Sequence, residues 1–94
     1  MMSTYKITAY TKEQARKLGV DVKPSTRKGK KLDVYKEGEK VATIGDVRYA
    51  DYPTYMQIKG AAFANERRRL YKARHETDRH VKGTSGYYAD KLLW

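Results

Sequence analysis

The scarcity of aliphatic side chains is the feature that most limits how this chain can fold. Leu, Ile, Val and Phe account for only 15 of the 94 residues, while Lys and Arg account for 21 and Asp and Glu for 11. Low apolar content with high charge is typical of disordered chains, but nine Tyr, three Met and one Trp offset the deficit. Because a Tyr ring can be buried while its hydroxyl stays hydrated, we expect one small domain over residues 1–94 with a thin, tyrosine-walled core.

The clearest local pattern is a β-hairpin between residues 32 and 44. Residues 32–35 and 40–44 are rich in β-formers, and they flank a short polar stretch centred on Glu37 and Gly38. Glycine at this place suits the positive φ angles of a tight hairpin turn. The expected pairs are Val34 with Val41 and Leu32 with Thr43 on one face, and Tyr35 with Lys40 on the other.

Three further elements are expected before the hairpin. The β-forming residues at 5–10 predict a short strand. Thr11 to Gln14 then fits a capping box, and Gly19 is a natural end for the helix that this box would open. Val20 and Val22 predict a second strand.

Helices are expected after the hairpin. One long helix should run from about Pro53 to His75, with Gly60 as its weak point, and a last helix capped by Thr84 or Ser85 should reach Leu93. In the long helix the periodicity predicts a core-facing stripe of Ala62, Phe63, Leu70 and Ala73, opposite a polar side with Asn65, Arg68 and Lys72. Together the elements predict an α+β fold: a small antiparallel sheet built on a central β-hairpin, packed by one long basic helix and two short helices.

The formal net charge of +10 points to a polyanionic partner such as DNA, RNA or an acidic protein surface. Residues 67–74 carry five positive charges, and Arg donors match phosphate oxygens. Residues 23–31 contain five basic and no acidic residues, which predicts a mobile basic loop that grips a nucleic-acid backbone. The candidate nucleic-acid-binding residues are Arg27, Lys28, Lys30, Lys31, Arg67, Arg68, Lys72 and Arg74. Solvated surface charge, or pairing with an acidic protein, is the alternative for both segments.

Other motifs give weaker signals. Among the tyrosines only Tyr35 is expected to face outward on the sheet, so core or interface roles outweigh base stacking for most of them. Residues 75–80 hold four possible metal ligands, but the two His are five apart and fall on different helix faces, so we expect no metal. Residues 82–86 resemble an anion cradle but lack the frame of a nucleotide-binding loop, and we expect no cofactor. No arrangement of residues suggests an enzyme.

Short elements from the hairpin onward resemble a family of small basic proteins found in giant DNA viruses and tailed phages, whose function is uncharacterised. The residues that carry the resemblance are Gly45-Asp46, Tyr49, Asp51-Tyr52, Arg69, Tyr71, Arg74-His75, Ser85-Gly86 and Leu92-Leu93-Trp94. The resemblance implies a viral origin and a place in the virion or the host-cell cytoplasm, and it assigns no catalytic residue.

Three functions are compatible with these features. The first is a non-enzymatic viral protein that binds nucleic acid through the phosphate backbone with little sequence specificity. The second is a minor capsid or internal virion protein that packs against protein neighbours or against copies of itself. The third is an inhibitor directed at a host protein. No apolar run is long enough for a membrane span and residues 1–6 lack the hydrophobic region of a secretory signal, so we expect no membrane partner.

Overall fold

The computed structural model describes residues 5–94 and has an α+β fold in which a three-stranded antiparallel sheet is combined with four helices. The predicted fold class is confirmed. Residues 1–4, which include most of the segment considered for a secretory signal, lie outside the described residues. In chain order the elements are α1 (Ala9–Leu18), β1 (Asp21–Pro24), β2 (Lys30–Lys36), β3 (Glu39–Asp46), α2 (Tyr52–Lys59), α3 (Ala61–Arg74) and α4 (Ser85–Leu93).

The hairpin of β2 and β3 forms around the predicted turn. Glu37 and Gly38 both have positive φ, 54° and 81°, as a two-residue turn that follows the twist of the strands requires. The expected pair of Tyr35 with Lys40 is confirmed, but the pairs on the other face are wrong: Val34 lies opposite Ala42, and Leu32 opposite Ile44. A bulge between Val34 and Tyr35 shifts the register by one residue. The predicted pairs are wrong because the alternation of the sequence does not reveal an extra residue in one strand.

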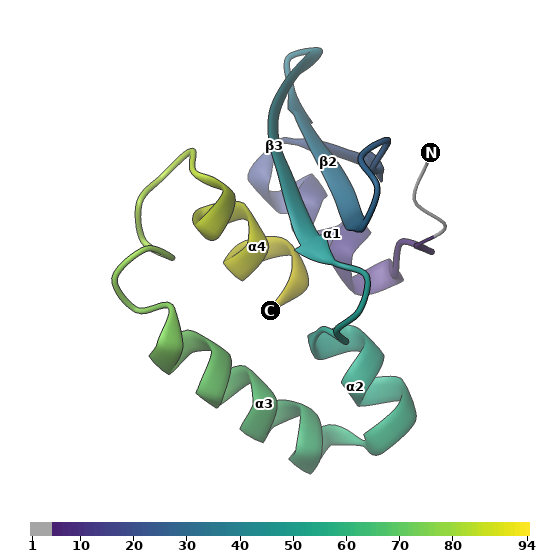
Figure 1. Ribbon diagram of the computed structural model, residues 1–94, viewed down its shortest axis with the longest axis vertical. Coiled ribbons are helices and arrows are strands. Elements are labelled where there is room, and N and C mark those ends of the chain that lie inside the picture. Colours follow the sequence, from purple (N-terminus) through teal and green to yellow (C-terminus); the bar gives the residue numbers. More distant parts are fainter. Residues whose placement is uncertain (1–4) are drawn as a thin grey trace.

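The core lies between one face of the sheet and the helices α1 and α4. Leu32, Val34 and Ile44 from the strands pack in one buried cluster with Leu92 and Leu93 from α4. Figure 1 shows α4 beside β3, with α1 behind the strands. The predicted Thr84 cap of the last helix and its end at Leu93 are confirmed, since the Thr84 side chain accepts a hydrogen bond from the Tyr87 backbone N–H at 3.3 Å.

The strand predicted over residues 5–10 is wrong. Thr8 is the N-cap of α1 and its hydroxyl accepts a hydrogen bond from the Thr11 backbone N–H (3.2 Å), so the helix begins at Ala9. Thr11, the predicted cap, is buried instead and donates a hydrogen bond to the carbonyl oxygen of Leu92 at 2.8 Å. The predicted helix end at Gly19 is confirmed.

The predicted long helix is divided at Gly60, whose φ of 88° and ψ of 173° interrupt the helical backbone between α2 and α3. In Figure 1 these two helices form an arm below the sheet, and α4 lies between α3 and the strands. None of the helices in residues 5–94 has the length and apolar character needed to cross a bilayer.

The predicted core-facing stripe of α3 is wrong, because its members are exposed. Phe63 and Leu70 are 43% and 36% exposed, and Ala62 and Ala73 are exposed as well. The face of α3 that turns toward the rest of the protein carries Ala64, which is fully buried, and half-buried side chains one and two turns further on, namely Arg68, Tyr71 and Lys72. The partners that the fold presents to α3 are a carboxylate and aromatic rings, so cationic and aromatic side chains are the ones that face inward.

Gly45 near the end of β3 provides a test of this packing. Its φ is +80°, and a Cβ there would lie 2.9 Å from Lys31 Cδ and 3.0 Å from Leu93 Cδ1. Gly29 has nearly the same φ, +84°, with nothing within 4 Å. We expect Gly29→Ala to cost about 1 kcal/mol of unfolding free energy through backbone strain alone, and Gly45→Ala about 1–3 kcal/mol more through the clash. Urea unfolding measures both, and equal losses would contradict the close approach.

Candidate functional site

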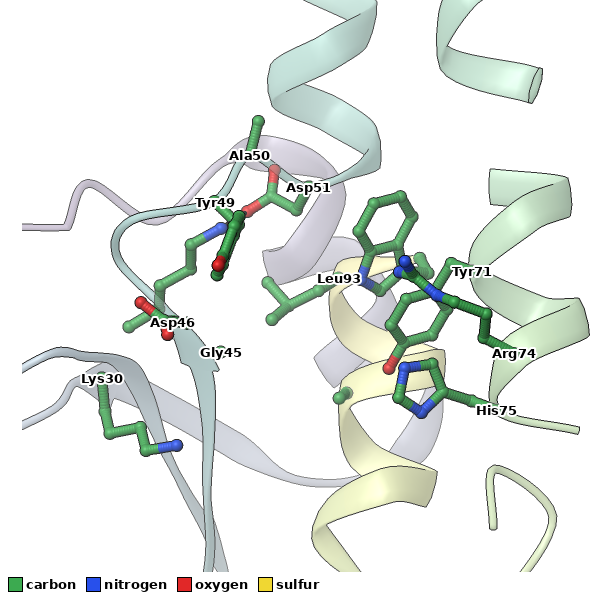
Figure 2. Close-up of a pocket in the computed structure, with 13 residues that line it drawn as sticks. Lys30, Gly45, Asp46, Tyr49, Ala50, Asp51, Tyr71, Arg74, His75 and Leu93 are labelled. Atoms are coloured by element: carbon green, nitrogen blue, oxygen red, sulfur yellow. Dashed lines mark hydrogen bonds and ion pairs between the residues drawn. The ribbon is translucent and has the colours of Figure 1, made fainter. Parts of the chain in front are cut away.

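A cavity of about 310 Å³ opens between the end of the sheet and the helices α3 and α4. The start of β2 and the end of β3 form one side with the loop that follows β3, and the last turns of α3 and α4 form the other. Figure 2 shows Tyr49 facing Tyr71, Arg74 and His75, with Leu93 between the two sides. Nine of the residues that carry the resemblance described above line this cavity: Gly45, Asp46, Tyr49, Asp51, Tyr71, Arg74, His75, Leu93 and Trp94.

A buried ion pair lies beside the cavity. Lys31 Nζ is 2.8 Å from Asp51 Oδ2, and the two side chains are 5% and 1% exposed. The Tyr5 hydroxyl donates to the same oxygen at 2.7 Å, and Asp51 Oδ1 accepts the backbone N–H of Thr54 at 3.1 Å as the N-cap of α2. Burial alone would raise the pKa of Asp51, but these hydrogen bonds and the Lys31 charge hold it below the usual value.

Stacked aromatic rings form the helical side. The Tyr71 ring lies parallel to the Trp94 ring, with 4.5 Å between centroids and 9° between planes, and the His75 ring lies 4.3 Å from Tyr71. Burial, followed by the negative charge of Asp90, raises the pKa of the Tyr71 hydroxyl to about 12. This side chain therefore stays neutral at physiological pH and serves as a rigid wall.

The buried carboxylate of Asp90 in α4 attaches α3 to the rest of the protein. Lys72 Nζ donates to Asp90 Oδ1 at 2.8 Å, and Arg79 lies 3.6 Å from the other oxygen. One turn away, the Arg68 guanidinium stacks 3.5 Å above the centre of the Tyr52 ring and donates to the Tyr10 hydroxyl at 3.2 Å. The charged groups of Lys72 and Arg68 are therefore occupied by contacts within the protein.

The sheet side of the cavity carries Lys30, Asp46 and Tyr49. Arg48 binds the Asp46 carboxylate through its side chain at 2.8 Å and its backbone N–H at 2.9 Å. These hydrogen bonds lower the pKa of Asp46 to about 2, so the pair stays ionised and its charges largely cancel. Tyr49 is 66% exposed.

The basic loop predicted over residues 23–31 is shorter than expected. Its ends belong to β1 and β2, and a turn at residues 25–29 remains. Ser25 is fully buried and its hydroxyl donates to Asp33 Oδ1 at 2.7 Å, while the Ser25 oxygen accepts the Arg27 backbone N–H at 3.0 Å. The turn is therefore anchored to the sheet, and its exposed side chains, Arg27 and Lys28, have a fixed base.

The eight predicted binding residues fall into three groups. Lys30 and Arg74 line the cavity from opposite sides, and Arg27 and Lys28 are exposed on the turn that precedes Lys30. Arg67 is half-buried, with its guanidinium 5.8 Å from the centre of the Tyr55 ring. The expectation that Lys31, Arg68 and Lys72 face a partner is wrong, because their charged groups contact Asp51, Tyr52 with Tyr10, and Asp90.

Of the cavity residues, only Lys30, Lys31 and Arg74 were predicted as site residues; Tyr49 and Trp94 are among those that were not. Tyr49 occurs between two turn signals, and an aromatic ring in a polar turn is the only sign that could have drawn attention to it. Trp94 entered the sequence analysis only among the residues that carry the family resemblance. Its place against Tyr71 depends on how α3 and α4 meet, which no local pattern reports.

The polar segment after α3 places its possible ligands in pairs. His75 Nδ1 lies 3.6 Å from Asp78, and His80 Nε2 lies 3.0 Å from Glu76. Within residues 5–94 no three His, Asp or Glu side chains come together in a way that could hold a metal ion.

Comparison with known proteins adds a family of unknown function. Residues 20–55 match the model of a family described as "Family of unknown function (DUF5754)". No curated protein and no solved structure shows significant similarity to the chain. The matched range includes the strands and the loop after β3, and thus the sheet side of the cavity with Lys30, Asp46 and Tyr49.

Asp33 provides a pH-dependent test of the anchored turn. Burial would raise its pKa, but hydrogen bonds from Ser25, Thr43 and the Thr26 backbone together lower it below the ordinary value of 3.8. A lowered folded-state pKa means that the ionised group stabilises the fold above about pH 4 and that this contribution is lost as the pH falls through the folded-state value. We expect Asp33→Asn to cost about 1–3 kcal/mol at pH 7 and progressively less toward pH 3.

Urea unfolding of the wild type and of Asp33→Asn across this pH range measures the difference. Asp21→Asn, at an exposed position on the neighbouring strand β1, controls for the loss of one negative charge. A cost for Asp33→Asn that stays constant with pH would show that the ionised carboxylate does not anchor the turn.

Proposed function

We propose that the protein is a binding protein rather than an enzyme, and that it binds nucleic acid through the phosphate backbone with little sequence specificity. The contacts are made by Lys30 and Arg74 at the cavity and by Arg27 and Lys28 on the adjoining turn. The resemblance to small basic viral proteins adds a virion or an infected cell as the setting of this proposal.

One observation supports the proposal above the others: the cations Lys30 and Arg74 line one cavity from opposite sides. Within residues 5–94 neither side chain makes an ion pair, whereas the two carboxylates that line the cavity, Asp46 and Asp51, are each held by another cation. The site therefore presents the positive charges of Lys30 and Arg74 at its edges. Phosphate oxygens are the ligands that such paired cationic donors suit.

The turn at residues 25–29 extends the positive surface. The Gly29 carbonyl oxygen accepts the Val47 backbone N–H at 3.0 Å, which holds the turn against the loop after β3. The backbone of the turn that carries Arg27 and Lys28 is consequently held next to the loop that lines the cavity. Four cations in this arrangement can follow successive phosphates along a strand.

Salt dependence provides the direct test. With four phosphate contacts, the logarithm of the association constant for an oligonucleotide should fall against the logarithm of salt concentration with a slope of about −3. Lys30→Ala and Arg74→Ala should each weaken binding and reduce the slope by about one. Fluorescence anisotropy titrations at several salt concentrations measure both.

Lys12→Ala and Lys17→Ala are matched controls, because they remove exposed cations of α1, which contributes no residue to the cavity. Binding that is insensitive to salt, or equally weakened by the α1 variants, would contradict the proposed site.

A structural role is favoured by a different observation, the apolar residues on the outer side of α2 and α3. Ile58 is 63% exposed, and Phe63 and Leu70 are also open to solvent. Exposed aliphatic and aromatic side chains on one arm suit contact with protein. If the arm mediates self-association, analytical ultracentrifugation should show a concentration-dependent oligomer, and Leu70→Glu should convert it to a monomer. A wild-type protein that is monomeric at all concentrations would contradict self-association.

A further inference from the structure

The cavity has an aromatic and apolar lining that binding of phosphate alone does not explain. Its 310 Å³ lies at the lower end of small-molecule sites, and its lining joins the stacked rings of Tyr71 and Trp94 and the apolar side chain of Leu93 to the exposed ring of Tyr49. A flat group that is apolar on its faces and polar at its edges matches this combination.

We propose that the cavity receives an unpaired nucleobase, so that the ligand of the protein is single-stranded nucleic acid. This inference rests on the proposed function and names its substrate class. Lys30 and Arg74 stand at the edges of the space, where they meet the phosphates on either side of an inserted base. The aromatic and apolar lining then contacts the base itself.

The pairing state of the ligand follows from the aromatic and apolar lining of the cavity. A base in a duplex is stacked on both faces and hydrogen-bonded at its edge. It can enter a cavity only after it is unstacked and unpaired, which costs free energy. A base in a single strand has an accessible face. The same cations would hold both kinds of backbone, but only the single strand fills the cavity.

Tyr49 is the residue on which this inference depends most. Its ring is largely exposed, one side lies 5.6 Å from the Arg48 guanidinium, and it faces the helical wall across the cavity. Asp46 fixes the position of Arg48 through its side chain and backbone. An exposed ring with one face supported by a fixed cation is a suitable stacking platform.

The experiment uses the only Trp of the chain, Trp94, as a reporter inside the cavity. Three probes of equal length, about 12 nucleotides, are titrated into the full chain at low salt: oligothymidylate, the same backbone with abasic sites in place of bases, and a duplex. We expect oligothymidylate to bind about tenfold or more tightly than the abasic strand and the duplex, and to quench Trp94 fluorescence, which the abasic strand leaves unchanged.

Variants separate base insertion from backbone binding. Tyr49→Ala should weaken oligothymidylate binding about tenfold to a hundredfold and leave binding of the abasic strand unchanged, and Tyr49→Leu should show the same loss while keeping apolar bulk. Val47→Ala is the matched control, because Val47 is exposed in the same loop but does not line the cavity.

Each outcome bears on one proposal. Equal, salt-sensitive binding of all three probes without quenching would overturn base insertion and leave the phosphate-binding function intact. Preference for the duplex would do the same. Absence of salt-sensitive binding to any probe would overturn the proposed function itself.

Discussion

The Asp51 carboxylate is the interaction on which the arrangement of the protein depends. It accepts hydrogen bonds from the Lys31 ammonium of β2, from the hydroxyl of Tyr5 and from the first turn of α2, all while 1% exposed. An ionised carboxylate taken out of water needs several donors to offset its lost hydration. The three donors come from three parts of the chain. The hydrogen bonds that they make to Asp51 therefore fix where α2 begins relative to the sheet.

The second constraint is the small number of apolar side chains. The core between the sheet, α1 and α4 uses most of the buried aliphatic residues, and Ala64 is the only fully buried apolar residue that α3 adds within residues 5–94. The contact of α3 with the rest of the protein is therefore made by an ion pair, Lys72 with Asp90, and by ring contacts of Arg68 and Tyr71. Long cationic side chains supply apolar stems as well as charge, which suits them to this place.

Local patterns predicted what local energetics determine. The hairpin turn at Glu37 and Gly38, the helix end at Gly19 and the cap at Thr84 follow from the backbone preferences of one or two residues, and the structure confirms them. The predicted N-terminal strand is wrong because Thr8, three residues before the expected box, caps a helix that begins at Ala9. Threonine is both a good strand former and a good helix cap. Only the hydrogen-bond partner of the Thr8 hydroxyl shows which role this residue has.

The orientation of α3 failed for a different reason. Periodicity predicts which face is apolar, but the face that packs is chosen by the partner, and the partners here are Asp90, Tyr52 and Trp94. The same failure affects the candidate site. Charge content found Lys30 and Arg74, which line the cavity, and also Lys31, whose charge is used by Asp51. The sequence does not show which cation has a buried carboxylate partner and which has none. The partner of Lys31, for example, lies 20 residues further along the chain.

The different partners of these cations bear on how the site behaves as salt rises. The wall of the cavity that carries Tyr71 and Arg74 is attached through Asp90, which is fully buried, whereas Lys30 and Arg74 meet solvent at the cavity edge. Partly buried ion pairs such as Lys72 with Asp90 are screened much less than exposed charges. Salt that releases a phosphate from Lys30 and Arg74 therefore leaves the Lys72–Asp90 contact in place, and the cavity keeps its shape while it loses its ligand.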